Sequence, residues 1–285
     1  SIGGTSVMRE PHGVVSAITG YNFPCLLYLA KIGPALLAGC TMVLKPSPLT
    51  PYQALIFADA AESAGLPAGV LNIINGGIET GNQITTDKRV DMVSFTGSDK
   101  VGAAIAAQAA PTLKKTHMEL GGKSALIVRK DADIAGAVQA GLTGFITHCG
   151  QGCALTTRHI VHNSVRAQYV AALQQAVAQV KVGNPADPSV MMGPLIRENA
   201  RERVERFVQS AVDSGAKLMA GGNRPADLDK GFYFEPTFFD DVDNRSMLAQ
   251  EEAFGPLACV IGFDSDDEAI QLANDSDFGL AGQIY

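Results

Sequence analysis

The sequence contains no hydrophobic run long enough to cross a lipid bilayer. Its best candidate, residues 25–38, is interrupted by Lys31, Gly33 and Pro34, whereas a spanning helix needs about 20 mostly apolar residues. The first residues also lack the basic stretch and apolar run that make up a signal peptide. We therefore expect no membrane partner and no signal peptide.

Charged residues are scarce, and the basic ones do not cluster. The 22 Lys and Arg residues are outnumbered by 29 Asp and Glu residues, for a net charge of −7. Because nucleic acids and anionic surfaces are recognised through basic patches, we expect neither as the main partner. With 46% hydrophobic and 18% charged residues, the chain can bury a substantial core, and disorder is not expected.

Cysteines are few, and their number is odd. The five are Cys25, Cys40, Cys149, Cys153 and Cys259. In a chain of 285 residues this is not a disulfide framework, and free thiols suit a reducing compartment. We therefore expect a cytoplasmic protein, with one large domain or two ordinary ones.

The first part of the chain alternates short apolar segments with helical patterns. Strands are expected at 14–18, 41–45, 70–74 and 92–95, and helices at 24–37, 51–64, from 80, and at about 99–109. This order is typical of βα units in a mostly parallel sheet. Continuous apolar strands also indicate a sheet covered on both faces. Residues 1–120 are therefore predicted to form a doubly wound α/β layer.

Residues 121–285 are predicted to form a second α/β region. Strands are expected at 125–128, 158–161 and 257–261, with another beginning at the last residues, and helices at 134–147, 165–180, 198–214 and 266–274. The stretch 221–231 is rich in Gly, Pro and Asp, which indicates a surface loop.

Two glycine-flanked segments carry the strongest chemical signal. Residues 118–123 read Met-Glu-Leu-Gly-Gly-Lys and place Glu119 beside two glycines, and residues 150–153 read Gly-Gln-Gly-Cys and end at Cys153. A thiol can attack an electrophilic carbon, and a carboxylate can activate the water that releases the product. The flanking glycines favour a catalytic over a buried structural Cys153. Cys149 ends an apolar helical pattern and is predicted to pack in the core.

Further candidates lie at strand ends, where open α/β sheets bind ligands. Lys45 could bond ribose or phosphate, or be an ordinary solvated lysine. Asn22 could donate to an oxyanion, or be a turn residue. Ser98 is a predicted N-cap of a helix whose N-terminus could hold phosphate, or only a cap. Residues 251–256 place acid, aromatic and turn residues between two strands.

A zinc site is the competing interpretation of one region. His148, Cys149, Cys153, His159 and His162 lie close together in the sequence. The cysteine spacing fits zinc, but the two later histidines are too close to each other and are predicted on opposite faces of a strand. We expect no metal.

Taken together, these segments resemble the aldehyde dehydrogenase superfamily over nearly the whole chain. The matching segments, in family order, are residues 21–24, 45–47, 95–98, 119–123, 150–153 and 252–256. The resemblance implies a Rossmann-like NAD(P)-binding domain in 1–120 and a catalytic domain in 121–285. It also implies NAD or NADP as cofactor, a small aldehyde as substrate, and a full-length homodimer or homotetramer.

The resemblance also implies a role for each matching residue. Cys153 resembles the nucleophile, and Asn22, with the Cys153 backbone N–H, resembles the oxyanion hole. Glu119 resembles the base that activates the hydrolytic water. The residues that resemble cofactor contacts are Lys45, Ser47, Gly97, Ser98, Glu252 and Phe254.

The chain departs from the family pattern at three points. Tyr21 stands before Asn22, where the family usually has Trp. Pro48 stands where a ribose-binding Glu is common, which leaves NAD and NADP both open. The chain is also short for the family, so an N-terminal part of the cofactor domain and a C-terminal part of the catalytic domain are expected to be missing.

Three other functions stay open from the sequence. A CoA-acylating relative would transfer the acyl group to a thiol, but such relatives commonly lack a base like Glu119. A cysteine thioesterase or hydrolase would need no cofactor, whereas Lys45, Ser98 and Glu252 resemble cofactor contacts. A non-catalytic fragment could bind nucleotide or a partner chain.

Overall fold

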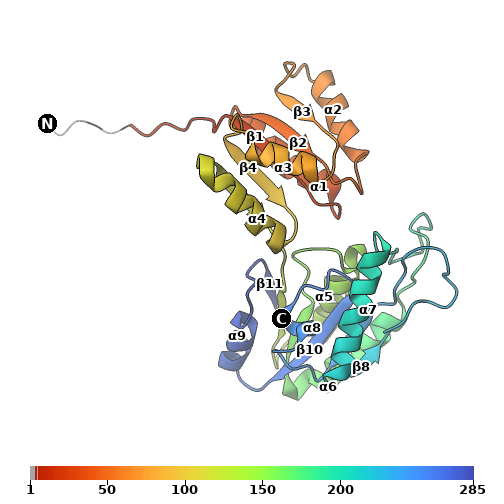
Figure 1. The fold of residues 1–285 in the computed structure, drawn as a ribbon. Helices are drawn as coiled ribbons and strands as arrows, with labels where there is room; N and C mark the ends of the chain where they lie inside the picture. The colour runs from red at the N-terminus through yellow and green to blue at the C-terminus, as the bar shows by residue number, and fades with distance from the viewer. Residues whose placement is uncertain (1–3, 5) are drawn as a thin grey trace. The chain divides into compact units, whose positions relative to one another are not determined.

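The computed structural model describes residue 4 and residues 6–285, and the chain divides into two compact units, one up to Leu120 and one from Gly121 to Tyr285 (Figure 1). The first unit is built on a five-stranded parallel sheet in the order β3-β2-β1-β4-β5. This is the strand order of doubly wound dinucleotide-binding sheets, in which the direction of winding reverses at the first strand.

Most elements of the first unit match their predicted positions. The strands are β1 (Val14–Ile18), β2 (Thr41–Lys45), β3 (Leu71–Ile73), β4 (Met92–Thr96) and β5 (Lys115–Glu119), and the helices are α1 (Pro24–Leu37), α2 (Gln53–Ser63), α3 (Ile78–Thr86) and α4 (Asp99–Ala109), followed by the short 3-10 turn η1 (Ala110–Thr112). The first two strands and the helices α1 and α4 are confirmed over their predicted ranges. Strand β5 was not predicted, because its sequence is polar.

Helices cover both faces of this sheet. Tyr28 and Ile32 of α1 pack with Val15 and Ala17 of β1 on one face. Ile84 of α3 and Ile105 of α4 pack with Val93 and Phe95 of β4 on the other. Because side chains alternate along a strand, Ser94 faces the side that carries α1.

The second unit contains a six-stranded sheet in the order β11-β6-β7-β10-β9-β8. Its neighbouring strands are parallel except β8, which runs antiparallel to β9. The strands are β6 (Ala125–Val128), β7 (Arg158–His162), β8 (Lys217–Ala220), β9 (Thr237–Asp240), β10 (Leu257–Phe263) and β11 (Gly282–Ile284), and the helices are α5 (Ile134–Ile146), α6 (Asn163–Ala178), α7 (Glu198–Asp213), α8 (Met247–Gln250) and α9 (Asp266–Asn274), with the 3-10 turn η2 (Thr147–Gly150). Of these elements β8, β9 and α8 were not predicted.

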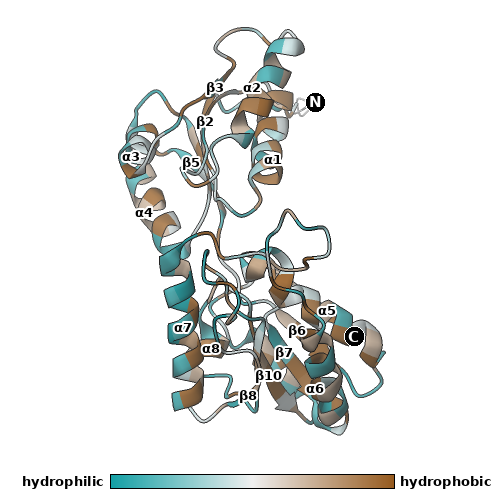
Figure 2. Cartoon of the chain, turned by 90° about the vertical axis from the view of Figure 1, so that its right-hand side faces the viewer, coloured by the Kyte–Doolittle hydropathy of each residue, from teal (hydrophilic) through white to brown (hydrophobic). Residues whose placement is uncertain are grey.

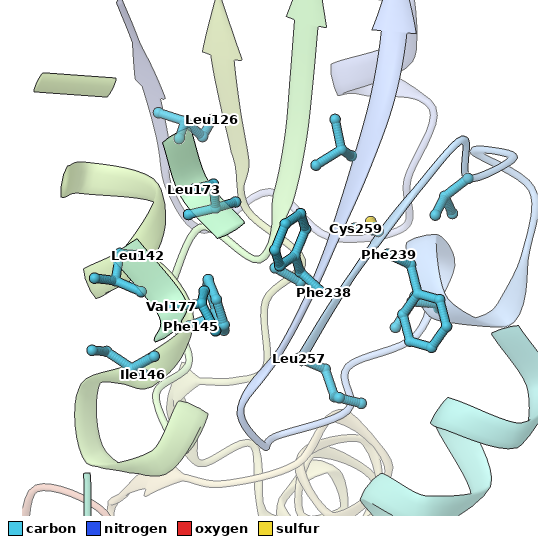
Figure 3. Close-up of a cluster of buried hydrophobic side chains, with 14 of the residues drawn as sticks. Leu126, Leu142, Phe145, Ile146, Leu173, Val177, Phe238, Phe239, Leu257 and Cys259 are labelled. Atoms are coloured by element: carbon cyan, nitrogen blue, oxygen red, sulfur yellow. The ribbon is translucent and has the colours of Figure 1, made fainter. Parts of the chain in front are cut away.

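The core of the second unit lies between its sheet and the helices α5 and α6. Figure 3 shows Phe145 and Ile146 of α5 close to Val177 of α6, with Phe238 and Leu257 contributed by the neighbouring strands. Helix α7 buries Val204, Phe207 and Ala211, and the rest of its surface is largely hydrophilic (Figure 2). No helix in the described part of the chain is both long and apolar enough to span a membrane.

Candidate functional site

In the first unit, the predicted site residues lie at one edge of the sheet. Asn22 follows β1, Lys45 ends β2, Gly97 and Ser98 follow β4, and Glu119 ends β5. The strands are parallel, and their register pairs Ile18 with both Lys45 and Phe95, and Thr96 with Glu119. The carboxyl ends of four strands are therefore level, as in the ligand-binding edge of open α/β sheets.

Lys45 is a buried lysine, not a solvated one. Its Nζ donates to the carbonyl oxygens of Pro46 at 3.0 Å and Gly76 at 2.9 Å. Burial lowers the pKa of Lys45. Ser47 is buried as well, and its Oγ accepts a hydrogen bond from the Leu49 N–H at 3.3 Å. The segment after β2 is thus a fixed turn with an ammonium group held at its start.

A cavity of about 470 Å³ lies beside this turn. Its lining residues are Pro48, Pro51, Tyr52, Leu55, Asn75, Gly76 and Gly77. Gly76 connects the two features, because its carbonyl oxygen accepts the Lys45 ammonium. Largely apolar walls with a few polar groups are typical of small-molecule pockets.

The turn after β4 is shaped by Gly97. A Cβ at this position would lie 2.4 Å from the ring of Phe95, so no larger residue fits without displacing that ring. Ser98 occupies the N-cap position of α4, as predicted, but its side chain makes no capping hydrogen bond. The predicted N-cap position of Ser98 is therefore confirmed.

Glu119 lies at the end of a line of polar side chains that sequence reasoning missed. The buried Lys31 donates from Nζ to Ser94 Oγ at 2.8 Å, and Ser94 Oγ lies 3.2 Å from His117 Nδ1. His117 Nε2 then lies 3.4 Å from Glu119 Oε1. Burial lowers the pKa of Lys31 to about 8, an effect that the negative charge of Glu119 partly offsets.

In the second unit, Cys153 follows a turn of unusual backbone. His148, Cys149 and Gly150 have φ values of 49°, 56° and 71°, in the left-handed region. A Cβ at Gly150 would lie 1.9 Å from the Gly255 carbonyl oxygen, so only glycine permits this close approach. Cys149 is buried in the hydrophobic core of the second unit, as predicted, and burial raises its pKa to about 12.

Cys153 itself is half-buried, and Gly122 touches its backbone. A Cβ at Gly122 would lie 2.2 Å from the Cys153 carbonyl oxygen. The Gly122 N–H also donates to Glu252 Oε1 at 3.1 Å. The backbone of Gly122 therefore contacts both Cys153 and Glu252. The close approach to the Cys153 carbonyl needs a residue without a side chain.

Gln151 fixes the loop that carries Cys153. Its Oε1 accepts from the Ile196 N–H at 3.1 Å, and its Nε2 donates to the His148 carbonyl oxygen at 2.9 Å. Sequence reasoning quoted Gln151 only as part of a motif, because a contact with residue 196 is not visible in local spacing. Phe254, two residues after Glu252, has a φ of 53°, a backbone conformation that is uncommon for a bulky residue.

The histidines of the competing zinc interpretation have other contacts. His159 is fully buried, with Nε2 3.1 Å from the Thr156 carbonyl oxygen and Nδ1 3.0 Å from Tyr169 Oη. His162 instead accepts from the Ser164 N–H at 3.1 Å at the start of α6. Within the described residues, no group of three or more His, Cys, Asp or Glu residues is placed to hold a metal.

Comparison with known proteins decides the family. The model of the aldehyde dehydrogenase family matches residues 3–285. The chain belongs to the aldehyde dehydrogenase family. It is 41% identical over 280 residues to the chloroplastic betaine aldehyde dehydrogenase of Atriplex hortensis, an alignment that covers 98% of this chain and 56% of that protein.

Solved structures agree on the fold of this chain. An aldehyde dehydrogenase of Mycobacterium tuberculosis, complexed with NAD+, is 46% identical with a TM-score of 0.95, covering 97% of this chain and 57% of that one. An NADP-dependent enzyme of E. coli is 40% identical with a TM-score of 0.94, at 97% and 57% coverage. The predicted fold class is confirmed, and the chain spans a little more than half the length of these relatives.

Proposed function

We propose that this member of the aldehyde dehydrogenase family oxidises a small aldehyde to the carboxylic acid with NAD or NADP. The observation that carries the proposal is the packing around Cys153, where the glycine pair after Glu119 and the segment 252–255 both contact the loop that bears the thiol. A thiol in such a loop is positioned as a nucleophile, whereas Cys149, with its raised pKa, is not.

In the first half of the reaction, Cys153 Sγ attacks the aldehyde carbon, and its thiol proton leaves to solvent. The carbonyl oxygen becomes an oxyanion, which the Asn22 side-chain amide and the Cys153 backbone N–H stabilise. A preorganised donor of this kind contributes roughly 3 to 4 kcal/mol. A bound nicotinamide would supply the acceptor for the hydride that leaves the substrate carbon. The product on the enzyme is a thioester of Cys153.

In the second half, Glu119 acts as general base. Its carboxylate takes a proton from a water molecule, and the resulting hydroxide attacks the thioester carbon. The carbon–sulfur bond breaks, the carboxylic acid leaves, and the proton taken by Glu119 returns to the sulfur, which restores the Cys153 thiol and the Glu119 carboxylate. The overall reaction consumes one aldehyde, one oxidised cofactor and one water. It yields one acid, one reduced cofactor and one proton.

We assign cofactor binding to both units of the chain. Lys45 and Ser47, with the cavity beside them, fit an adenosine moiety, and Gly97 and Ser98 lie at the N-terminus of α4, where backbone N–H groups attract phosphate. In the second unit, Glu252 would hold the nicotinamide ribose and Phe254 would pack near the ring. Pro48 has no carboxylate to repel a 2′-phosphate, so NADP is a permitted cofactor beside NAD.

We also propose that the whole protein forms a homodimer or homotetramer and works in the cytoplasm. The assembly is what the family resemblance of the sequence implies. The compartment is supported by five cysteines that form no disulfide.

The test is formation of NADH or NADPH, followed at 340 nm, from a panel of aliphatic and aromatic aldehydes. We expect turnover with the wild type and none with Cys153→Ala, while Cys149→Ala serves as the matched thiol control and stays active. Turnover that needs free CoA would instead indicate the acylating relative, and ester hydrolysis without cofactor would indicate a thioesterase. Activity that survives Cys153→Ala would contradict the proposal.

A further inference from the structure

His117 is the one member of the polar line behind Glu119 that approaches the carboxylate itself. Lys31 and Ser94 are both buried, and they come from different elements, α1 and β4. The register of the sheet places Ser94 opposite His117, so the line crosses from helix to central strand to edge strand. It ends at the 3.4 Å separation between His117 Nε2 and Glu119 Oε1.

The direction of the first hydrogen bond follows from the donor inventory. A lysine ammonium has only donors, so Ser94 Oγ accepts from Lys31 and keeps its own O–H to donate. Ser94 Oγ has a second acceptor site, so His117 Nδ1, 3.2 Å away, accepts from the Ser94 O–H in one imidazole tautomer and donates in the other. A neutral imidazole whose Nδ1 accepts carries its proton on Nε2. Nε2 is the ring atom that lies 3.4 Å from Glu119 Oε1.

We propose that His117 is a positioning residue for Glu119, holding the carboxylate through an Nε2–H tautomer in which Nδ1 accepts from Ser94. The inference rests on the proposed function, in which Glu119 is the base of thioester hydrolysis. With Oε1 held by His117, Oε2 is left to take the proton of the attacking water. His117 touches neither the thiol nor the substrate in this assignment.

The solvent exposure of His117 and Glu119 explains why the contacts through Lys31 and Ser94 are needed to fix the His117 ring. The side chains of His117 and Glu119 are 52% and 46% exposed, so solvent competes for both groups. An isolated pair of this exposure contributes little. A ring whose other nitrogen is bonded to a buried serine is fixed in orientation, and the carboxylate then has one preferred partner.

The kinetic test separates the two halves of the reaction. In His117→Asn we expect the first turnover of NAD(P)H formation to keep its wild-type rate while thioester hydrolysis slows about tenfold, because the base is misplaced. A burst of reduced cofactor then precedes a slow steady state. His117→Gln, whose amide N–H can reach Glu119, should recover to within about threefold of the wild type. Lys115→Gln, an exposed position on the same strand face, is the control and should behave as wild type.

A second measurement does not depend on activity. Nitrogen-15 NMR of the imidazole rings reports which nitrogen carries the proton, and His117→Asn identifies the His117 signals among the five histidines. We expect the Nε2–H form in the wild type and a mixture of tautomers in Ser94→Ala.

An Nδ1–H form in the wild type, or equal slowing of both reaction halves in His117→Asn, would overturn the inference. Wild-type turnover that does not respond to His117→Asn would overturn this inference alone. Absence of turnover in the wild type would overturn the proposed function with it.

Discussion

Gly122 shows how one residue without a side chain links three functional segments. It follows Glu119 by three positions, its α-carbon lies against the Cys153 carbonyl, and its N–H donates to Glu252. The atom that a Cβ would meet belongs to the backbone, so rotation of a side chain cannot relieve the clash. Any larger residue must displace either the loop of Cys153 or the segment of Glu252.

The replacement Gly122→Ala is therefore expected to damage activity more than stability. A shift of about 1 Å in a reacting group costs on the order of a hundredfold in rate, and we expect a loss of at least that size in kcat/KM.

Gly33→Ala is the matched control, because a Cβ there meets no atom within 4 Å. Because Pro34 follows and its ring disfavours a helical neighbour that carries a Cβ, we expect unchanged activity and no gain in stability. Comparison of kcat/KM and the thermal midpoint for both variants decides the matter, and wild-type activity in Gly122→Ala would refute the steric argument.

At the same scale, the sequence predicted the site residues that sit in local motifs and missed those that act across strands. Cys153 and Glu119 were visible because glycines flank them within three positions. Lys31, Ser94 and His117 come from three separate elements, and only the register of β4 on β5 brings them into line. The roles in catalysis and cofactor binding that the sequence predicted for Cys153, Glu119 and the other motif residues stay predictions.

At the scale of elements, the central strands were predictable and the edge strands were not. Strands β1 and β4 are apolar and buried on both faces, so their sequences differ from the helices around them. Strand β5 reads Lys-Thr-His-Met-Glu and is largely exposed, and β8 is likewise an exposed edge strand. Such edge strands form because a neighbouring strand offers backbone hydrogen bonds. The residue pattern of the edge strand itself does not reveal that neighbour.

Helix α1 carries a buried cation whose charge opposes folding. Lys31 has a pKa of about 8 in the folded protein, below its ordinary 10.5. Between these values the unfolded chain binds more protons than the folded chain, so the free energy of unfolding rises with pH across this interval. We expect the free energy of unfolding to increase by about 1 to 2 kcal/mol between pH 8 and 9.5.

The replacement Lys31→Met removes the titrating group and should flatten this rise. Urea unfolding of wild type and variant at several pH values measures the two slopes. Other groups titrate in the same pH range, so the effect of Lys31 is measured as the difference between the pH slopes of the wild type and of Lys31→Met. Parallel slopes would show that burial does not perturb Lys31.

At the scale of the whole molecule, acid stability depends on a neutral histidine in the core of the second unit. His159 is fully buried between Thr156 and Tyr169. Burial lowers its pKa to about 4 from an ordinary 6.5, because the charged ring loses its hydration. The unfolded chain therefore binds one proton more than the folded chain between these pH values.

Stability is then expected to fall as the pH drops from about 6.5 to 4, with His159 contributing up to about 3 kcal/mol of the loss. Carboxylates add to acid denaturation, so the variant His159→Asn isolates the contribution by showing a shallower decline from its own neutral-pH stability. His12→Asn, at an exposed position, should decline in parallel with the wild type. Chemical unfolding at pH 7, 5.5 and 4.5 measures all three proteins. An equally steep decline in His159→Asn would mean that the core admits the charged ring and that acid unfolding begins elsewhere.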